Sequence, residues 1–364
     1  MTKTTWTLRD AMRLSHPKGV DKSVGNYILR GEVTEDAPAI LHGFTAMQSA
    51  GNVKDVLAVL DEHKNLPWET IPTQFLKEVK VWEALFRNGA LNGQALVRNV
   101  TRLARIGAFN DMQFAAEYAA RLSDDKMIAR TRLHPLNFLN ALVVHTEGQK
   151  VRGGNSWAYS FHVNRNKDWT TSSVIAGALE DGFYKSFKYV EPAGKATMIA
   201  LDVSGSMGSA ASGLDLSCYE VEAAMAMTVA RTEPAHQIVA FSHSLRETGV
   251  TKNDSLNEAM RKIQAIGMGG TDVAAPMVYA KKNNLKVDTF AVFTDNETWA
   301  GKIKPFQALK QYRDHSGIPA RLAVVGLNST GFSVADPSDP GMLDIVGGDA
   351  NLPRILADFS AGRI

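Results

Sequence analysis

Four short, nearly continuous apolar runs after about residue 194 constrain the fold of this chain most. They are "KATMIALDV" (195–203), "HQIVAFS" (236–242), "VDTFAVFTD" (287–295) and "ARLAVVGL" (320–327). Runs of this length fit strands that are buried on both faces of a parallel sheet. Helical segments alternate with them, at 217–232, 255–266, 272–283, 305–313 and 352–360. This alternation predicts a doubly wound α/β domain that binds ligands beyond the carboxyl ends of its strands.

The first half of the chain has a different pattern. Apolar residues recur three and four positions apart in a series of segments, at 40–48, 53–64, 81–89, 93–109, 112–122, 134–148 and 174–190. Short breakers such as Gly51-Asn52 and His134-Pro135 separate these segments. Successive short helices joined by tight turns are typical of an α-helical repeat array of the HEAT-like kind, although no fixed period is evident. We therefore expect a helical region over residues 1–190 and an α/β domain over 191–364.

Composition narrows the class of protein. The 364 residues carry a net charge of +2, and residues 1–194 hold 24 Lys and Arg against 20 Asp and Glu. This mild excess permits a local basic patch for nucleic acid, and it equally fits an ordinary solvated surface. Cys218 is the only cysteine, so no intramolecular disulfide forms, and neither a signal peptide nor a membrane-spanning run is evident. A cytoplasmic protein with no membrane partner is the expectation.

The connection at 148–172 interleaves basic and aromatic residues. Lys150, Arg152, Arg165 and Lys167 alternate with Trp157, Tyr159, Phe161 and Trp169. Cationic groups among rings suit RNA, because they contact phosphates while the rings stack on bases. The alternative is a polar loop that its aromatic residues pin to the helices.

A set of oxygen-bearing side chains follows the strands of the α/β domain. Asp202 ends the first apolar run, and Ser204 and Ser206 lie in the turn after it. Thr271 stands in the glycine-rich turn "GMGGTD", and Asp295 ends the run "AVFTD". Carboxylates and hydroxyls at the same edge of a sheet are the ligands that Mg²⁺ prefers. These five residues are the predicted metal site.

Other chemistries explain the motif less well. A nucleophilic aspartate of the phosphatase kind calls for a second carboxylate two residues later, where this chain has Ser204. An activated serine calls for glycines two residues to either side, and Ser206 has Gly208 on only one side. The remaining alternative is that Asp202 and the two serines only cap the following turn and helix. No general base accompanies either aspartate, so we expect a non-catalytic protein.

The arrangement of Asp202, Ser204, Ser206, Thr271 and Asp295 resembles the metal-ion-dependent adhesion site of von Willebrand factor A domains. Longer strings, among them "RLSHPKG", "RLHPLNFLNAL", "FYKSFKYVEPAGK" and "FTDNETWAG", resemble the Ro autoantigen (TROVE-domain) family over nearly the whole chain. The resemblance implies a helical-repeat ring closed by a von Willebrand A-like domain. It also implies binding of small non-coding Y RNAs, capture of misfolded RNA in quality control and, in bacteria, exoribonuclease partners.

The same resemblance implies RNA contacts in "RLSHPKG", by position at His16 and then at Lys18 and Arg13. His16 capping a helix is the alternative. Members of the family usually carry further helical repeats before this string, so we expect an N-terminally shortened ring, which homo-oligomerisation would close.

Scattered basic residues of the helical region are further candidates for phosphate contacts. Arg98, Arg102 and Arg105 are spaced to share one face of a helix, where an ordinary solvated face is the alternative. The other candidates are Arg130, Arg132, Lys150 and Arg152. A second functional hypothesis is a protein-interaction module, in which the metal binds an acidic residue of a partner.

Overall fold

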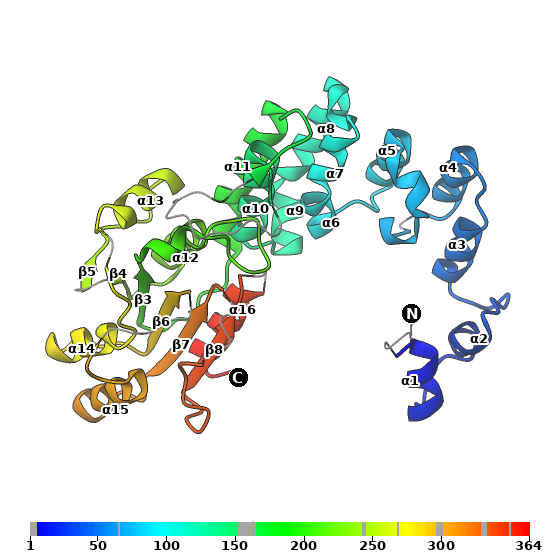
Figure 1. The fold of residues 1–364 in the computed structure, drawn as a ribbon. Helices are drawn as coiled ribbons and strands as arrows, with labels where there is room; N and C mark the ends of the chain where they lie inside the picture. Colours follow the sequence, from blue (N-terminus) through cyan, green and yellow to red (C-terminus); the bar gives the residue numbers. More distant parts are fainter. Residues whose placement is uncertain are drawn as a thin grey trace. The chain divides into compact units, whose positions relative to one another are not determined.

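The computed structural model describes residues 6–64, 66–151, 163, 165–241, 245–267, 269–295, 301–328, 333–348 and 351–364 (Figure 1). The chain divides into two compact units, one ending at Phe114 and the other beginning at Ala115, inside helix α8 (Met112–Leu122). This division lies before the 190/191 boundary expected from the sequence. The reason is that the helices after α8 group with the α/β domain, since α10 and η4 pack against α12.

The first unit consists of short helices. They are α1 (Leu8–Ser15), α2 (Lys22–Arg30), α3 (Ala39–Gln48), α4 (Val53–Glu62), η1 (Trp68–Thr70), η2 (Thr73–Lys77), α5 (Val79–Arg87), α6 (Gly93–Arg98), α7 (Val100–Arg105) and η3 (Ala108–Asn110). Each of the pairs α1–α2, α3–α4 and α4–α5 is in contact, as a helical repeat requires. Polar side chains cap α1, α2, α4 and α6, for example Asn52, which accepts hydrogen bonds from two backbone N–H groups of α4.

The segment 93–109, expected as one helix, is divided in the structure. Helix α6 ends at Arg98, α7 begins at Val100, and the short helix η3 follows. Asn99, between the first two, has φ −91° and ψ 1° and is buried. Its side-chain amide donates to the Ala95 carbonyl, so a polar side chain competes with the helical backbone at this point.

The second unit begins with the rest of α8 and three more helices, α9 (Asp125–Thr131), α10 (Pro135–Glu147) and α11 (Ser173–Ser186), followed by η4 (Phe187–Tyr189). Helices α10 and α11 pack closely together. A Cβ at Gly182 of α11 would lie 2.6 Å from the ring of Phe138 on α10, so only glycine permits this approach. Strands β1 (Gln149–Lys150) and β2 (Arg165–Asn166) pair antiparallel within the predicted irregular connection.

A six-stranded sheet forms the rest of the second unit. Its strands are β3 (Thr197–Asp202), β4 (His236–Phe241), β5 (Leu245–Glu247), β6 (Thr289–Thr294), β7 (Arg321–Gly326) and β8 (Met342–Val346), in the spatial order β5-β4-β3-β6-β7-β8. All neighbours are parallel except β4 and β5. The predicted doubly wound α/β fold is thereby confirmed. Strand order reverses between β3 and β6, where folds of this kind open a crevice.

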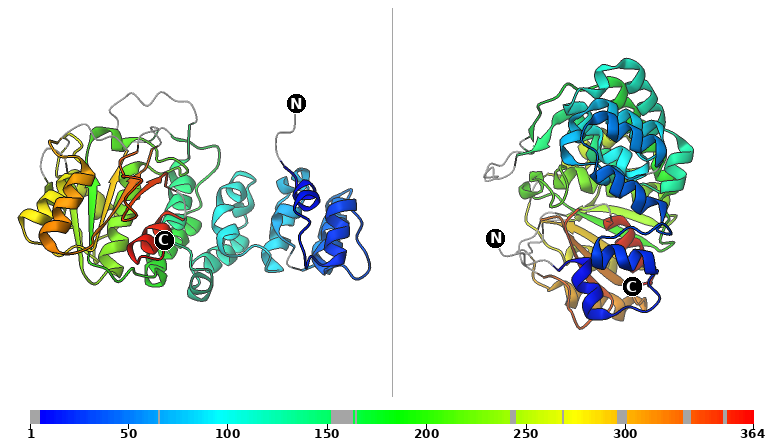
Figure 2. Two further views of the ribbon diagram at one scale, coloured as in Figure 1. Left: turned by 90° about the horizontal axis from the view of Figure 1, so that it is seen from below. Right: turned by 90° about the vertical axis from the view of Figure 1, so that its right-hand side faces the viewer.

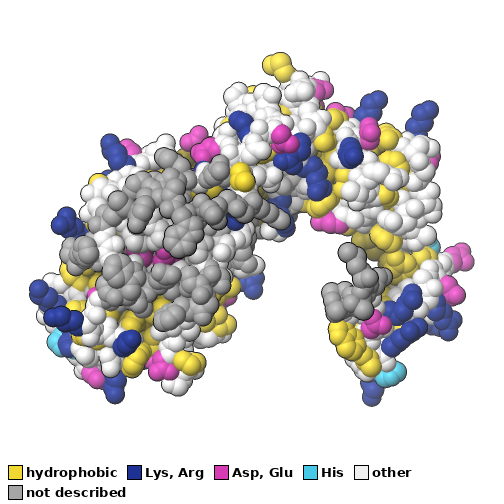
Figure 3. Space-filling view, viewed as in Figure 1, with side chains coloured by type: hydrophobic (Ala, Val, Ile, Leu, Met, Phe, Trp, Pro, Cys, Tyr) yellow, Lys and Arg dark blue, Asp and Glu magenta, His cyan; other side chains and the backbone are white. Residues whose placement is uncertain are grey.

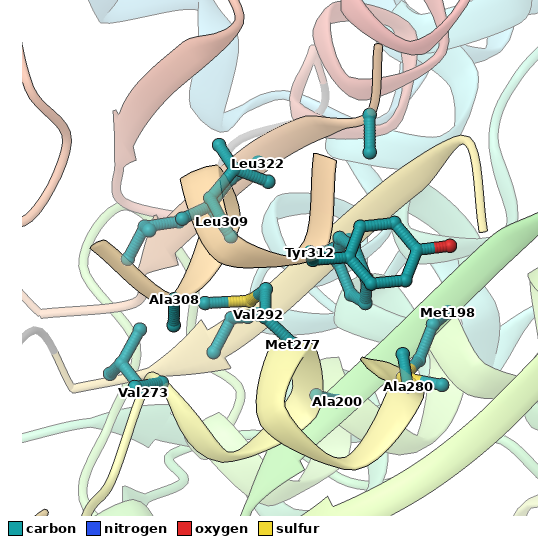
Figure 4. Close-up of a cluster of buried hydrophobic side chains, with 14 of the residues drawn as sticks. Met198, Ala200, Val273, Met277, Ala280, Val292, Ala308, Leu309, Tyr312 and Leu322 are labelled. Carbon is teal, nitrogen blue, oxygen red and sulfur yellow. The ribbon is translucent and has the colours of Figure 1, made fainter. Parts of the chain in front are cut away.

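Helices cover both faces of this sheet. They are α12 (Cys218–Thr232), α13 (Leu256–Gln264), α14 (Ala275–Lys282), α15 (Pro305–Ser316) and α16 (Leu352–Ser360), with the short helix η5 (Gly205–Gly208) after β3. One buried cluster joins α14 and α15 to alternate residues of the strands, including Met198, Val292 and Leu322 (Figure 4). Side chains of a strand point alternately to the two faces of a sheet. The strand residues that alternate with those of this cluster therefore point to the opposite face, which α12 and α16 cover (Figure 2).

Within the described parts of the chain, every helix is too short or too polar to cross a lipid bilayer.

Candidate metal centre and RNA-binding residues

Four of the five predicted metal ligands meet at the crevice between β3 and β6. Asp202 ends β3 and is fully buried, while Thr271 precedes α14 and is 1% exposed. Ser204 is buried at the start of η5, and Ser206, inside η5, is exposed. Asp295, the fifth, directly follows β6 and is 9% exposed. Parallel neighbouring strands bring Asp202 and Asp295 to the same edge because β3 and β6 run in register.

Hydrogen bonds organise these groups around the carboxylate of Asp202. Its Oδ2 atom accepts from the hydroxyls of Thr294, at 2.8 Å, and Thr271, at 3.2 Å. Its Oδ1 atom accepts from the Ser204 backbone N–H at 2.8 Å. The hydroxyls of Ser204 and Ser206 lie 3.1 Å apart. Oxygen atoms from three separate segments of the chain therefore converge on one point.

The capping alternative explains only part of this geometry. Asp202 does accept from the N–H two residues later, as an aspartate that caps a turn would. Ser204, however, stands at the N-cap of η5 without a side-chain hydrogen bond to the helix. Its hydroxyl faces Ser206 instead, an arrangement in which both oxygens are available to a shared ligand.

The electrostatics of the site favour a bound cation. Burial, with a small contribution from the charge of Asp295, raises the pKa of Asp202 to about 6, against the lowering effect of the Ser204 N–H and the Thr294 hydroxyl. A divalent cation would offset both the burial and the repulsion. In the described residues no three carboxyl, imidazole or thiol side chains cluster, and the other oxygens beside the Asp202 carboxylate are those of hydroxyl groups.

Two further residues belong to this site and escaped the sequence analysis. Thr294, fully buried, precedes Asp295 in "FTD", where its side chain follows the strand pattern. Glu222 of α12 is fully buried, and its Oε1 atom accepts from the Asp202 N–H at 3.1 Å. Its Oε2 atom is buried with no hydrogen-bond partner in the structure. Burial, and then the charge of Asp202, raises the pKa of Glu222 well above its usual range. An acid within the apolar run "VEAAMAM" was the available signal.

The loop that carries the serines is held from several sides. Tyr219 of α12 donates its hydroxyl to the Ser204 carbonyl at 2.8 Å. Lys150 of β1 donates its ammonium group to the carbonyls of Ala211, at 3.1 Å, and Leu214, at 2.6 Å. Lys150 was expected to contact RNA phosphates. In the structure its ammonium group is hydrogen-bonded to these two carbonyls instead, so we correct the assignment of Lys150 as an RNA contact.

The other described residues of the basic and aromatic connection also make internal contacts. Arg165, whose side chain is 8% exposed, pairs with Glu147 at 2.6 Å and with Glu220 at 2.8 Å. Trp169 is buried and donates to the His145 carbonyl at 3.1 Å. For these residues the structure agrees with the alternative interpretation, in which the side chains of the connection attach it to the neighbouring helices. Arg152, Trp157, Tyr159 and Phe161 lie outside the described residues.

The expected arginine face of residues 98–105 does not form as a single exposed surface. Arg98 and Arg105 are exposed, on α6 and α7 respectively. Arg102 is half-buried, with its guanidinium 4.7 Å from the ring centroid of Trp68 and 5.7 Å from that of Trp82. The cation–π contact gives Arg102 a packing role and removes it from the predicted phosphate stripe.

The remaining RNA candidates lie at the surface of their own units. Arg13, His16 and Lys18 are all exposed at the C-terminal end of α1. His16 ends this helix in the left-handed conformation, with φ 42°, and its N–H donates to the Met12 carbonyl, so it also fills the capping role. In the second unit, Arg130 is exposed, and Arg132 is exposed and paired with Glu191.

Comparisons with known proteins agree with this architecture. The family model described as "Ro60 vWA domain" matches residues 196–360, and the model described as "TROVE domain" matches residues 63–156. A relative from Deinococcus radiodurans, named RNA-binding protein RO60, is 37% identical over 370 residues, which covers 99% of this chain and 66% of that protein. The protein of the same name from Caenorhabditis elegans is 35% identical over 326 residues, covering 89% of this chain and 48% of that protein.

The crystal structure of the Deinococcus radiodurans RO (RSR) protein superposes with a TM-score of 0.83 at 35% identity, covering 99% of this chain and 71% of that one. This chain thus spans about two thirds of one curated relative and about half of the other. Sequence identity, domain models and fold all confirm the family that the sequence motifs suggested. The chain belongs to the Ro family, whose members combine a TROVE domain with a von Willebrand A-like domain.

Proposed function

We propose that this chain is a non-catalytic RNA-binding protein of the Ro type. The observation that carries the proposal is its 37% identity, over 99% of its length, to a protein named for RNA binding. The exposed end of α1 supports it, because Arg13, His16 and Lys18 present donors for phosphate oxygens on a helix with no buried residues.

The specific ligand belongs to the same proposal. We propose small structured non-coding RNA of the Y-like kind as the main ligand and misfolded RNA, in quality control, as a second one. An exoribonuclease partner and a cytoplasmic location follow from the family resemblance. Self-association draws support from the exposed apolar side chains of the first unit, among them Leu8, Leu14 and Ile40.

RNA binding can be tested by fluorescence anisotropy with a labelled stem–loop RNA that carries a single-stranded 3′ tail. We expect affinity to fall steeply with salt, and Arg13→Glu/Lys18→Glu to weaken binding about tenfold by removing two phosphate contacts and adding repulsion. The control Lys195→Glu/Lys252→Glu makes the same charge change at exposed positions of the α/β domain. Equal affinities of the two double variants would contradict the assignment to α1.

A second function, capture of an acidic partner residue through a metal ion, is favoured by the oxygen-lined crevice. Asp202, Ser204, Ser206, Thr271 and Asp295 would hold a divalent cation, for which Mg²⁺ fits the donor set best. Two carboxylates only balance the charge of a divalent cation, and the three hydroxyls are neutral ligands, so a coordination position left open would accept one further carboxylate from outside.

Calorimetric titration of the chain with MgCl₂ tests the metal site independently of any partner. We expect binding by the unaltered protein and none by Asp202→Ala. Ser338→Ala, at an exposed hydroxyl that bonds only to Asp336, is the control. Magnesium binding by Asp202→Ala with unchanged affinity would refute the site, and loss of metal with RNA affinity retained would separate the two functions.

A further inference from the structure

Helices α14 and α15 of the second unit border an open groove that none of the proposed functions uses. The groove measures about 440 Å³ and is lined by residues that include Val278, Lys281, Lys282, Ile303 and His315. A second groove of about 340 Å³ adjoins it and shares Val278, Lys282 and Ile303, with Lys302 added at its rim. We call the two together the α14–α15 groove.

Positive charge is concentrated around this groove. Residues 275–282 and 301–316 hold six Lys and Arg and one acid, Asp314, whereas residues 195–364 as a whole hold 16 Lys and Arg against 18 Asp and Glu. The remainder of that range is therefore acidic, with 10 basic residues against 17 acidic ones. Figure 3 shows several separate Lys and Arg side chains along the side of the α/β domain that carries α14 and α15.

The lysines at the rim are available to a ligand. Lys282 and Lys302 are exposed, and neither makes an ion pair or side-chain hydrogen bond to the described residues. Lys281 contacts only the neutral amide oxygen of Gln311, at 3.2 Å. The carboxylate at the groove, Asp272, is half-buried and accepts from the Ala274 N–H at 3.0 Å. The charge of the three lysines thus has no partner within the groove.

The composition favours a phosphodiester backbone over a protein partner. Protein interfaces are depleted in lysine and enriched in arginine, whereas lysine commonly binds phosphate oxygens as a point charge. Among the described residues that line the two grooves there is no arginine. The apolar floor is partly open, since Val278, which lines both grooves, is 41% exposed. Such surfaces contact the faces of unpaired bases.

We infer that the α14–α15 groove binds single-stranded RNA, with Lys281, Lys282 and Lys302 contacting phosphates beside an apolar floor. The inference rests on the proposed RNA binding of the chain, and it adds a second contact surface to the helical one. The α/β domain then takes part in holding RNA, in addition to any role of its metal site.

The test measures anisotropy of a fluorescein-labelled U20 RNA with the full chain. We expect Lys281→Glu/Lys282→Glu/Lys302→Glu to weaken binding about tenfold or more at 0.1 M KCl, and to lower the slope of log K against log salt by about 2, since each single-strand phosphate contact contributes ~0.7. The control Lys195→Glu/Arg246→Glu/Lys252→Glu places equal charge changes at exposed positions of the same domain. An affinity equal to that of this control would overturn the inference.

A triple alanine variant at the same lysines supplies the same comparison if the reversed charges prevent folding. RNA substituted with 4-thiouridine is expected to crosslink to peptides from 275–282 and 301–310. If the groove variants keep RNA affinity and lose only binding to an acidic peptide with Leu at helical spacing, the groove is a protein-docking site and the inference is wrong. If the unaltered chain binds neither U20 nor the stem–loop RNA, the proposed function itself fails, which this design distinguishes.

Discussion

Replacing Asp202 by asparagine should stabilise the metal-free protein, although it alters the central residue of the proposed metal site. Asp202 is fully buried, and burial raises its pKa from 3.8 to about 6. Above pH 6 the folded protein therefore carries a buried charge that the unfolded chain solvates. A shift of about two pKa units corresponds to about 3 kcal/mol of lost folding free energy.

Asparagine fits the same hydrogen bonds without the charge. Its carbonyl oxygen accepts from the Ser204 N–H in place of Oδ1. Its amide group donates to the hydroxyls of Thr271 and Thr294, which rotate to become acceptors. We expect Asp202→Asn to raise the melting temperature of the α/β domain by about 6–12 °C in EDTA at pH 7.5, since 1 kcal/mol shifts a domain of this size by about 2–4 °C.

The sign of the pH dependence follows from the raised pKa. An acid whose folded pKa is raised favours folding below the unfolded pKa, and that contribution is lost as the pH rises through the folded pKa. The stability difference between the unaltered protein and Asp202→Asn should therefore open between about pH 4 and pH 6 and stay constant above that. Saturating Mg²⁺ should close it, because a ligand at 100 times its Kd contributes about 2.7 kcal/mol.

Thermal melts by circular dichroism, in EDTA and in MgCl₂ across this pH range, measure these differences. Asp314→Asn, at an exposed position without a hydrogen-bonded partner among the described residues, controls for the loss of one charge. A melting temperature of Asp202→Asn below that of the unaltered protein in EDTA would refute the reasoning. So would a failure of Mg²⁺ to stabilise the unaltered protein.

Three further predictions concern packing and hydrogen bonds elsewhere in the second unit. Gly182→Ala should cost about 1–3 kcal/mol in urea unfolding because its Cβ would overlap Phe138, whereas Gly177→Ala in the same helix, with nothing within 4 Å, should gain up to about 1 kcal/mol. His134→Asn should reduce the loss of folding free energy that the unaltered protein shows as the pH falls below 6.5. Burial lowers the pKa of His134 to about 3, and its ring nitrogen accepts from the Leu136 N–H only when it is unprotonated. Acid unfolding curves that are the same for both proteins would contradict this. Lys150→Met should lower the melting temperature and leave RNA anisotropy unchanged, because its ammonium group is bonded to two carbonyls; a selective loss of RNA affinity would restore its predicted RNA role.

Most of the secondary structure followed from local pattern. The four long strands of the sheet and its five helices lie where apolar runs and helical spacing predicted them. The exceptions are short or weakly patterned. Strand β5 has three residues at the edge of the sheet, and β8 is only partly buried, so neither forms the continuous apolar run that identified the central strands. Helices α1, α2 and α9, with eight, nine and seven residues, also lie outside the predicted helical segments, because each is too short to give a long periodic pattern.

The roles of basic residues were predicted less well. The sequence pattern alone assigned Arg102 to an exposed stripe and Lys150 to RNA, because the residues next to a charged side chain in sequence do not show which group it contacts in the folded protein. Arg102 instead packs on Trp68, more than thirty residues earlier, and Lys150 on the loop at 211–214. Contacts between residues so distant in sequence depend on the folded chain.

For the proposed metal site too, some features could be predicted from the sequence and others depend on the folded structure. The residues of the predicted metal site could be selected from the sequence, because the carboxyl ends of parallel strands lie at one edge of a sheet. The structure brings the side chains of Asp202, Ser204 and Thr271 together there, and metal binding by them stays a prediction. The spacing of the oxygens, the burial that raises the pKa of Asp202, and the fully buried Glu222 behind it arise only when β3, β6 and α12 pack together. Chemical type is a property of each residue, whereas proximity and desolvation are properties of the packed fold.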